Sequence, residues 1–392
     1  MPSHPLQVRV IETLEDLEGL RSDWEGLLAM IPGVSIFSSW EWLVPWWRAF
    51  GHGQRLHVLS FQNSGSRLAG LAPLSLATRR SAGIQWKIAR LMGDGSKDSD
   101  NLDLPVLPQY EEDLIASLLD HLAVHPQQWD FCEWNTVPEN SPLATRLPVH
   151  LKQRNWPLVS TSTPCSSIVL PETWESYVKQ LSAKERGKLG IRTRRLEKLY
   201  DVRYRRCSQM RELDGDLESL FRLHQLRWQA DGRAGSFRSP ARRRFYCDLA
   251  SLLLSRNQLQ FWLLELDGKA VAAQFGFRFG HTVYSLQEGF DPALAKDSVG
   301  YVLRAHVLRT LIAEGVRKYD FLGGVNDSKT RWGAQVGRYV NFQFARPRTA
   351  GSFYLRGKWG LTRCKKVLRS RLSPRAWSIL HGLNARLRGP RQ

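Results

Sequence analysis

One continuous stretch, residues 284–332, decides how the chain is expected to fold: YSLQEGFDPALAKDSVGYVLRAHVLRTLIAEGVRKYDFLGGVNDSKTRW. Its extended start, residues 284–290, is followed by an Asp-Pro-Ala turn. Apolar residues then recur at helical spacing over residues 301–314, and Gly315 follows where helices commonly end. Residues 319–322 have the composition of a short buried strand, which two glycines break. The stretch therefore predicts a strand, a loop, a helix, a strand and a second loop.

The start of the predicted helix is a candidate anion site. The first N–H groups of a helix have no partner inside it, and the helix dipole favours negative charge at the same place. A pyrophosphate group of a bound donor fits these properties, whereas an ordinary capped helix start would hold only water. The candidate binding residues are those that precede and begin the helix: Lys296, Ser298, Val299, Gly300 and Tyr301.

Composition limits the classes of protein to consider. The 392 residues suggest two or three domains with ample core. No apolar run is long enough for a membrane span, and the first residues do not resemble a secretory signal. The five cysteines lie far apart without a CxxC pair, which argues against a zinc site or a disulfide framework and favours a reducing cytoplasm. We therefore expect no metal.

The net charge of +19 indicates an anionic partner: nucleic acid, acidic lipid headgroups or phosphorylated small molecules. Basic residues concentrate in residues 184–206, which could also be an ordinary solvated helix face. Residues 348–392 contain no Asp or Glu, and their Lys and Arg residues alternate with apolar ones. That tail resembles a basic amphipathic helix suited to an anionic membrane surface, although nucleic-acid contact or a disordered tail would give the same composition.

We expect three parts: an α/β unit over residues 1–160, a second unit over 161–346 with a Ser/Thr-rich linker at the boundary (160–164), and the basic tail at 347–392. The polar loop 93–100 contains carboxylates that could bind a metal, but no further ligand pattern supports this, so we interpret it as a solvated loop. Trp40 belongs to an aromatic segment that predicts a core wedge or, less commonly, a stacking platform for a base or sugar.

Three short motifs resemble the GNAT acyltransferase fold, and most closely the cellulose-biosynthesis-associated and Fem-like branch with two tandem GNAT-like units. They are FSSWEWL at residues 37–43, LHQLRW at 223–228, and YDFLGG at 319–324 followed by Lys329 and Trp332. The resemblance covers roughly residues 8–346. It implies an α/β (α+β) fold of two tandem GNAT-like domains with mixed central sheets flanked by helices, plus the basic helical tail. The chain departs from the family pattern at Ser328, where an aromatic residue is common, and at Val299, where proline is common.

By resemblance, we expect a transferase that moves an acyl group from acetyl-CoA or another acyl-CoA onto an amine or hydroxyl of a cell-envelope or polysaccharide precursor. Alternatives are a Fem-like transferase that uses aminoacyl-tRNA, a non-catalytic scaffold at the inner face of the membrane, and a nucleic-acid binder driven by charge. Glu288 is the first candidate for the general base, or else a structural carboxylate paired with an arginine. Asp320 and Lys329 are expected to line the same cleft, or else to form a structural ion pair. The expected substrate-binding residues are Trp40, His224, Arg227, Trp228 and Trp332, although the apolar neighbours of His224 are more typical of a buried, satisfied histidine than of a catalytic one.

Overall fold

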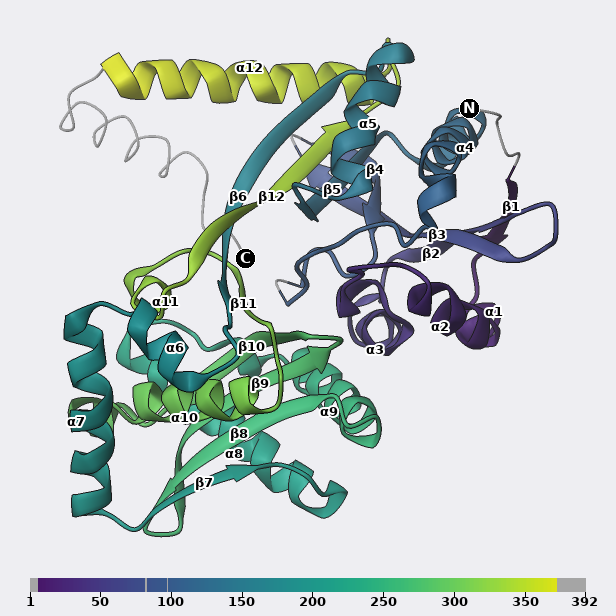
Figure 1. Cartoon of the computed structure of the whole chain (residues 1–392). Coiled ribbons are helices and arrows are strands. Elements are labelled where there is room, and N and C mark those ends of the chain that lie inside the picture. Colours follow the sequence, from purple (N-terminus) through teal and green to yellow (C-terminus); the bar gives the residue numbers. More distant parts are fainter. Residues whose placement is uncertain (1–5, 82, 97, 372–392) are drawn as a thin grey trace.

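The computed structural model describes residues 6–371 apart from 82 and 97, and within residues 361–371 only the backbone. Twelve strands in this part of the chain form one mixed sheet (Figure 1). In spatial order they are β1 (Gln7–Ile11), β2 (Arg55–Gln62), β3 (Leu68–Ser81), β4 (Ile84–Leu91), β5 (Phe131–Pro138), β12 (Gln335–Phe344), β6 (Leu158–Val169), β11 (Lys318–Gly323), β10 (Thr282–Phe290), β9 (Lys269–Phe279), β8 (Leu259–Leu266) and β7 (Val202–Arg206).

The sheet contains the same pattern twice. In the first half of the molecule, β1 to β4 pair antiparallel and β5 joins β4 in parallel. In the second half, β7 to β10 pair antiparallel and β11 joins β10 in parallel. The helices that flank the first half are α1 (Leu14–Gly19), α2 (Arg21–Ala29), α3 (Trp40–Phe50), α4 (Glu111–Val124) and α5 (Pro142–Gln153). Those of the second half are α6 (Trp174–Gln180), α7 (Ala183–Leu199), α8 (Met210–Ala230), α9 (Pro240–Ser255), α10 (Val299–Ala313) and α11 (Asp327–Thr330). The predicted mixed fold is confirmed.

Strands β6 and β12 cross between the halves. β6 follows the first half in the chain but pairs with β11, whereas β12 ends the second half but pairs with β5, and the two strands pair with each other. The linker predicted at residues 160–164 is wrong, because these residues lie inside β6 opposite β12. Their threonines suit an extended strand, and Asn341 of β12 donates a hydrogen bond to Thr163 (2.8 Å).

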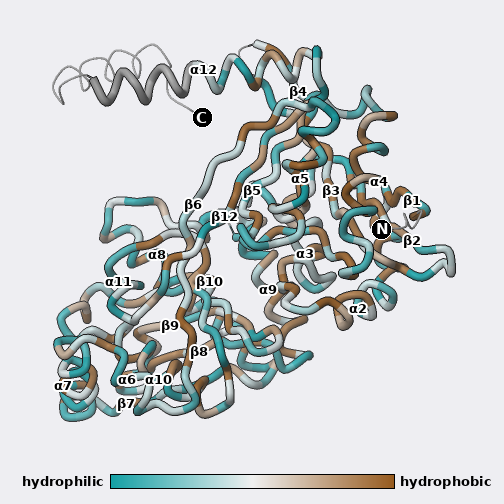
Figure 2. Tube along the Cα trace, turned by 45° about the horizontal axis from the view of Figure 1, so that its top comes forward, coloured by the Kyte–Doolittle hydropathy of each residue, from teal (hydrophilic) through white to brown (hydrophobic). Residues whose placement is uncertain are grey.

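The hydrophobic core extends across both halves. Phe37 and Trp42 of the first half pack edge-on against aromatic residues of the second, with ring centroids 5.6 Å apart for Phe37–Tyr284 and 5.2 Å for Trp42–Phe245. Figure 2 shows strongly hydrophobic stretches along β8, β9 and β10, the strands that this core covers. A last helix, α12 (Ala350–Arg371), begins beside the first half and extends away from the sheet (Figure 1). None of the described helices is both long and apolar enough to cross a bilayer.

Candidate functional site

Strands β10 and β11 separate in the middle of the sheet. They pair in parallel only from Thr282 to Tyr284, after which β10 continues along β9 and β11 bulges against β6. At this bulge Leu322 has a φ of 61°, a left-handed conformation that is rare for a bulky side chain. Such strain persists only where the surrounding structure imposes it, and it is often found at functional sites. Two cavities lie at this opening.

The first, here named the helix cavity, has a volume of about 310 Å³ and lies at the start of α10. Ser298 precedes the helix with a φ of 58° and makes no side-chain cap, and no hydrogen bond is assigned to the N–H of Val299 or Gly300 within the described residues. These amides therefore remain available to a ligand. Of the residues expected to bind the donor, Ser298, Val299, Gly300 and Tyr301 line the cavity, whereas Lys296 lies in the exposed turn before them and does not.

Positive charge dominates the walls of the helix cavity. Its lining includes four arginines: Arg192, Arg227, Arg304 and Arg331. Glu288 is the one acidic residue among the lining residues. Arg192 of α7 lies over the ring of Tyr301 at 4.4 Å, and the same ring packs against Trp332 at 4.5 Å. A helix start with free amides surrounded by arginines is suited to a phosphorylated ligand.

The second cavity, here named the interface cavity, has a volume of about 300 Å³ and lies between the halves. It shares Arg227, Glu288, Arg304 and Ser328 with the helix cavity, so the two meet at the opening between β10 and β11. Its other lining residues come from the first half, from α8, from β10 and from β11 and the segment that follows it: Asp98, Asp100, Trp228, Ser285, Leu286, Gln287, Phe321, Leu322, Gly323, Asn326 and Lys329.

Glu288 lies where the two cavities meet. Its carboxylate accepts hydrogen bonds from Arg227 (3.0 Å) and from the buried Arg304, while 32% of its side chain stays exposed. Burial alone would raise the pKa of Glu288, but the two guanidinium groups outweigh it and hold the pKa below its ordinary value. The carboxylate is thus ionised at neutral pH and already paired, as the structural alternative for this residue expects.

Lys329 and Asp320 support the loop after β11 instead of pairing with each other. The Lys329 ammonium donates to the carbonyls of Phe321 (2.9 Å), Gly323 (2.7 Å) and Gly324 (3.0 Å), and burial lowers its pKa. Asp320 accepts the N–H of Leu322 (2.8 Å) and contacts Lys318 (3.0 Å). Lys329 lines the interface cavity, whereas Asp320 lines neither cavity. Together they hold the strained backbone of Leu322.

The described residues of the polar loop 93–100 are mostly buried or half-buried, with Gly95 exposed, so the prediction of a solvated loop was wrong. Asp98 is fully buried, with contacts to Tyr246 (3.0 Å) and Arg242 (3.0 Å) of α9, and burial raises its pKa to about 6. Asp100 accepts the N–H of Gly323 (2.8 Å), and burial raises its pKa as well. A polar composition predicts exposure, but here the second half covers the loop. No local signal in the sequence indicates that contact.

The predicted substrate-binding residues occupy different places. Arg227 lines both cavities, Trp228 the interface cavity and Trp332 the helix cavity. His224 is buried and lines neither; its Nε2 accepts a hydrogen bond from Trp228 (2.8 Å), and burial lowers its pKa to about 4. Trp40 also lines neither, since it is buried in the core with Arg21 over its ring at 4.1 Å. The core interpretation of its aromatic segment is therefore the one that fits the structure.

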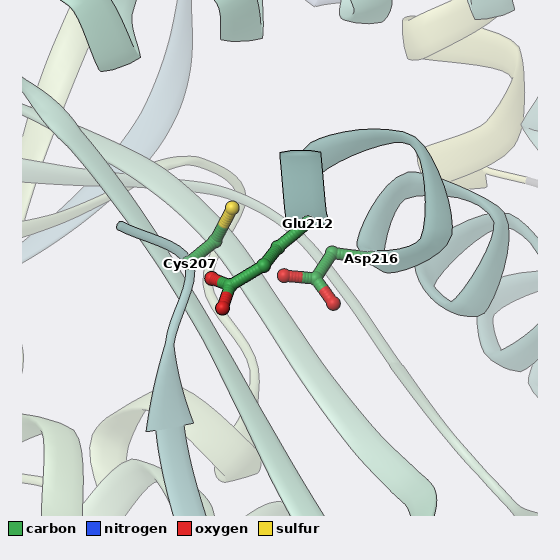
Figure 3. A group of neighbouring side chains, drawn as sticks. All are labelled: Cys207, Glu212 and Asp216. Atoms are coloured by element: carbon green, nitrogen blue, oxygen red, sulfur yellow. The ribbon is translucent and has the colours of Figure 1, made fainter. Parts of the chain in front are cut away.

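A group of possible metal ligands lies elsewhere in the second half. Cys207, Glu212 and Asp216 are close together, as Figure 3 shows. However, Arg205 donates to both carboxylate oxygens of Asp216 and contacts Glu212, and burial raises the pKa of the Cys207 thiol to about 12. A guanidinium thus already neutralises the carboxylates, and the thiol stays protonated, so the group does not suit a metal ion.

The comparisons with known proteins agree with this geometry. Residues 183–330 match the family described as the Acetyltransferase (GNAT) domain. This part of the second half is thus similar to a GNAT-type acetyltransferase domain. The matched part includes α7, the start of α10, the opening between β10 and β11, and Lys329.

Solved structures resemble nearly the whole described chain, not the GNAT domain alone. FemX is similar with a TM-score of 0.61 at 11% identity, covering 86% of this chain and 96% of FemX. A protein of unknown function from Bacteroides thetaiotaomicron is similar with a TM-score of 0.54 at 14% identity, covering 86% of this chain and 100% of that chain. At such identities the likeness shows the fold alone. Among curated protein sequences, none matches the chain.

Proposed function

We propose that the protein transfers an acyl group from a phosphorylated carrier in the helix cavity to an amine or hydroxyl acceptor in the interface cavity. One observation carries the proposal: the two cavities have separate walls but meet at Glu288, Arg227, Arg304 and Ser328. A donor bound by its phosphates at the start of α10 can extend its acyl end to this junction, and an acceptor can reach the same point from the other side.

Acetyl-CoA or another acyl-CoA is the donor that we favour. Its pyrophosphate suits the free amides of Val299 and Gly300 and the guanidinium groups of Arg192 and Arg331. The alternative donor, aminoacyl-tRNA, is favoured by the basic surface of α7, which continues outward from Arg192 through exposed residues such as Arg194, Arg195 and Lys198. The resemblance of the motifs to the Fem-like branch implies the same alternative.

In the proposed reaction the acceptor atom attacks the acyl carbonyl carbon, its proton passes to a carboxylate, and the carrier leaves as its thiolate or alkoxide. Three carboxylates line the interface cavity, and Asp98 is already held by Tyr246 and Arg242, so the candidate bases are Glu288 and Asp100. We favour Asp100, since one of its oxygens has no assigned partner in the described part of the chain and burial raises its pKa toward the working pH. Glu288 then holds Arg227 and Arg304 beside the carbonyl oxygen, where negative charge develops.

The acceptor would come from a cell-envelope or polysaccharide precursor, as the resemblance of the motifs implies. The rival proposal is a non-catalytic scaffold that retains the cavities without turnover. The two differ in one respect: a scaffold has no need of a proton-accepting carboxylate in the interface cavity, whereas Asp100 supplies one.

The first experiment is a thermal-shift series with acetyl-CoA, longer acyl-CoAs and charged tRNA. A ligand that binds only the folded state raises the melting temperature. We expect acyl-CoA to raise it, and Arg331→Gln to remove most of that rise. The matched control is Arg194→Gln, which changes an exposed arginine on α7 that does not line the helix cavity. If none of these donors shifts the melting temperature of the unchanged protein, the transferase proposal fails and the scaffold gains support.

A further inference from the structure

Helix α12 is docked on the first half of the molecule through its first turns, and Lys358 also donates a hydrogen bond to Gln343 of β12 (3.3 Å). Leu355 is buried, and Tyr354 packs against Trp86 (4.6 Å) and Phe131 (5.4 Å) of the first half. Gly351 lies so close to the backbone of Asp130 that a Cβ atom there would overlap it. The first turns are thus docked tightly enough to set the direction of the helix, which then extends away from the body (Figure 1).

Large apolar side chains on this helix face solvent. Phe353 is 64% exposed and Trp359 is 49% exposed, although their neighbour Leu355 is buried. A soluble surface tolerates single exposed apolar residues, but two large aromatic residues on one projecting helix indicate a contact surface. Because Phe and Trp partition favourably into the boundary between lipid headgroups and acyl chains, they are typical of helices that lie on membranes.

Charge identifies the kind of membrane. Residues 348–392 contain 12 Lys and Arg residues and neither Asp nor Glu. Within the part whose side chains are described, Arg356 and Lys358 are exposed between the two exposed aromatic residues. An ordinary solvated helix mixes both signs of charge, so an excess of one sign this large points to a surface of the opposite sign.

We propose that α12 binds the surface of an anionic lipid bilayer, with Phe353 and Trp359 inserted at the headgroup level. Nucleic acid would bind the same positive charge through its phosphates. A duplex, however, has no unpaired bases on which the exposed aromatic residues could stack. A second copy of the chain would bury the aromatic residues but would meet an equally basic helix. The bilayer satisfies both properties together.

The test is co-sedimentation of the full-length protein with phosphatidylcholine vesicles, prepared with and without phosphatidylglycerol. We expect binding only to the vesicles that contain phosphatidylglycerol, with weakening at high salt. The double variant Phe353→Ser/Trp359→Ser should bind at least about tenfold more weakly, and Arg356→Glu at least about fivefold. Both variants change exposed side chains, and an unchanged melting temperature will show that they fold.

Matched controls distinguish binding through α12 from non-specific binding through exposed basic or apolar residues elsewhere on the protein. Lys184→Glu and Ile191→Ser alter an exposed basic and an exposed apolar residue of α7, and both should leave vesicle binding unchanged. The proposal is overturned if the α7 variants reduce binding as much as the α12 variants do. It is also overturned if the double variant Phe353→Ser/Trp359→Ser binds vesicles normally. Loss of self-association or of single-stranded RNA binding in this variant, measured without vesicles, would overturn it too.

Discussion

Asp100 of the first half accepts a hydrogen bond from the backbone N–H of Gly323 in the second half, at 2.8 Å. The contact joins the two halves where β11 bends, next to the left-handed Leu322 and the Lys329 ammonium. A carboxylate from one half therefore stands beside the opening in the sheet of the other. If the interface cavity is the acceptor site, both halves contribute to it.

Asp100→Asn should lower the rate of acyl transfer by at least about a hundredfold, because the amide cannot accept a proton from the acceptor. Its oxygen can still accept the N–H of Gly323, so the fold should persist. The measurement is the steady-state rate with an acceptor on which the unchanged protein is active, compared with Glu288→Gln. The control Asp94→Asn alters another acidic residue of the same loop, held by Asn135 and outside both cavities. Full activity of Asp100→Asn, with loss in Glu288→Gln, would return the role of base to Glu288.

Lys329→Met should destabilise the protein by about 2–3 kcal/mol, since three backbone carbonyls lose the charged donor that they share. Urea unfolding measures the change. Lys318→Met serves as the control, because that ammonium is 44% exposed and contacts only Asp320 among its assigned ion pairs, so the expected loss is below about 1 kcal/mol. Equal losses in the two variants would contradict the supporting role that we assign to Lys329.

Gly289→Ala should destabilise the protein by about 3 kcal/mol or more, because β10 and α8 approach each other too closely at this point for a methyl group. The added Cβ would overlap the backbone of Leu223 and His224, which a rotamer change cannot relieve. Gly215→Ala on the same helix α8 meets no atom within 4 Å and should stabilise the helix by about 0.5–1 kcal/mol. Thermal unfolding of both variants checks the opposite signs.

Acidification should destabilise the protein partly through His224. Burial lowers the pKa of His224 to about 4, whereas an unfolded histidine titrates near its ordinary value of about 6.5. The unfolded state thus binds the proton more readily, so this stabilisation is complete above pH of about 6.5 and is lost as the pH falls toward about 4. Each pKa unit corresponds to about 1.4 kcal/mol, which sets the loss between pH 7 and pH 5 at about 2 kcal/mol.

The His224→Gln variant tests this assignment, because its amide oxygen can replace Nε2 as the acceptor of the Trp228 hydrogen bond without titrating. The free energy of unfolding should depend less steeply on pH between 7 and 5 in this variant than in the unchanged protein. A dependence of the same slope would assign the acid sensitivity to other buried histidines, such as His57 and His121, whose pKa values burial also lowers.

The sequence predicts local structure well where periodicity and turn chemistry are strong. The helix that begins at Val299 and the strands before and after it follow from apolar spacing and from glycine positions. The same local signals placed the start of the helix near residues 298–301, where the free amides depend only on the helix; that these amides bind an anion stays a prediction. The fold class followed from the order of such elements.

Contacts between distant segments could not be predicted in this way. The threonines of residues 160–164 suit a loop as well as a strand, and only the pairing with β12 decides between them. Likewise, the exposure of Asp98 and Asp100 depends on α9 and on the bend after β11, far along the chain. Whether Glu288 acts as a base or as a structural partner depends on the positions of Arg227 and Arg304, which its own sequence neighbours do not reveal.

The exchange of β6 and β12 has a consequence for the way the molecule unfolds. Each half completes its sheet with a strand that the chain provides from the other side of the midpoint, so a fragment of either half alone would expose a long, unpaired edge. The two GNAT-like repeats therefore cannot fold and unfold independently of each other. Calorimetry should record one cooperative unfolding transition for both halves. Each half expressed alone should aggregate, whereas the two halves expressed together should remain in solution.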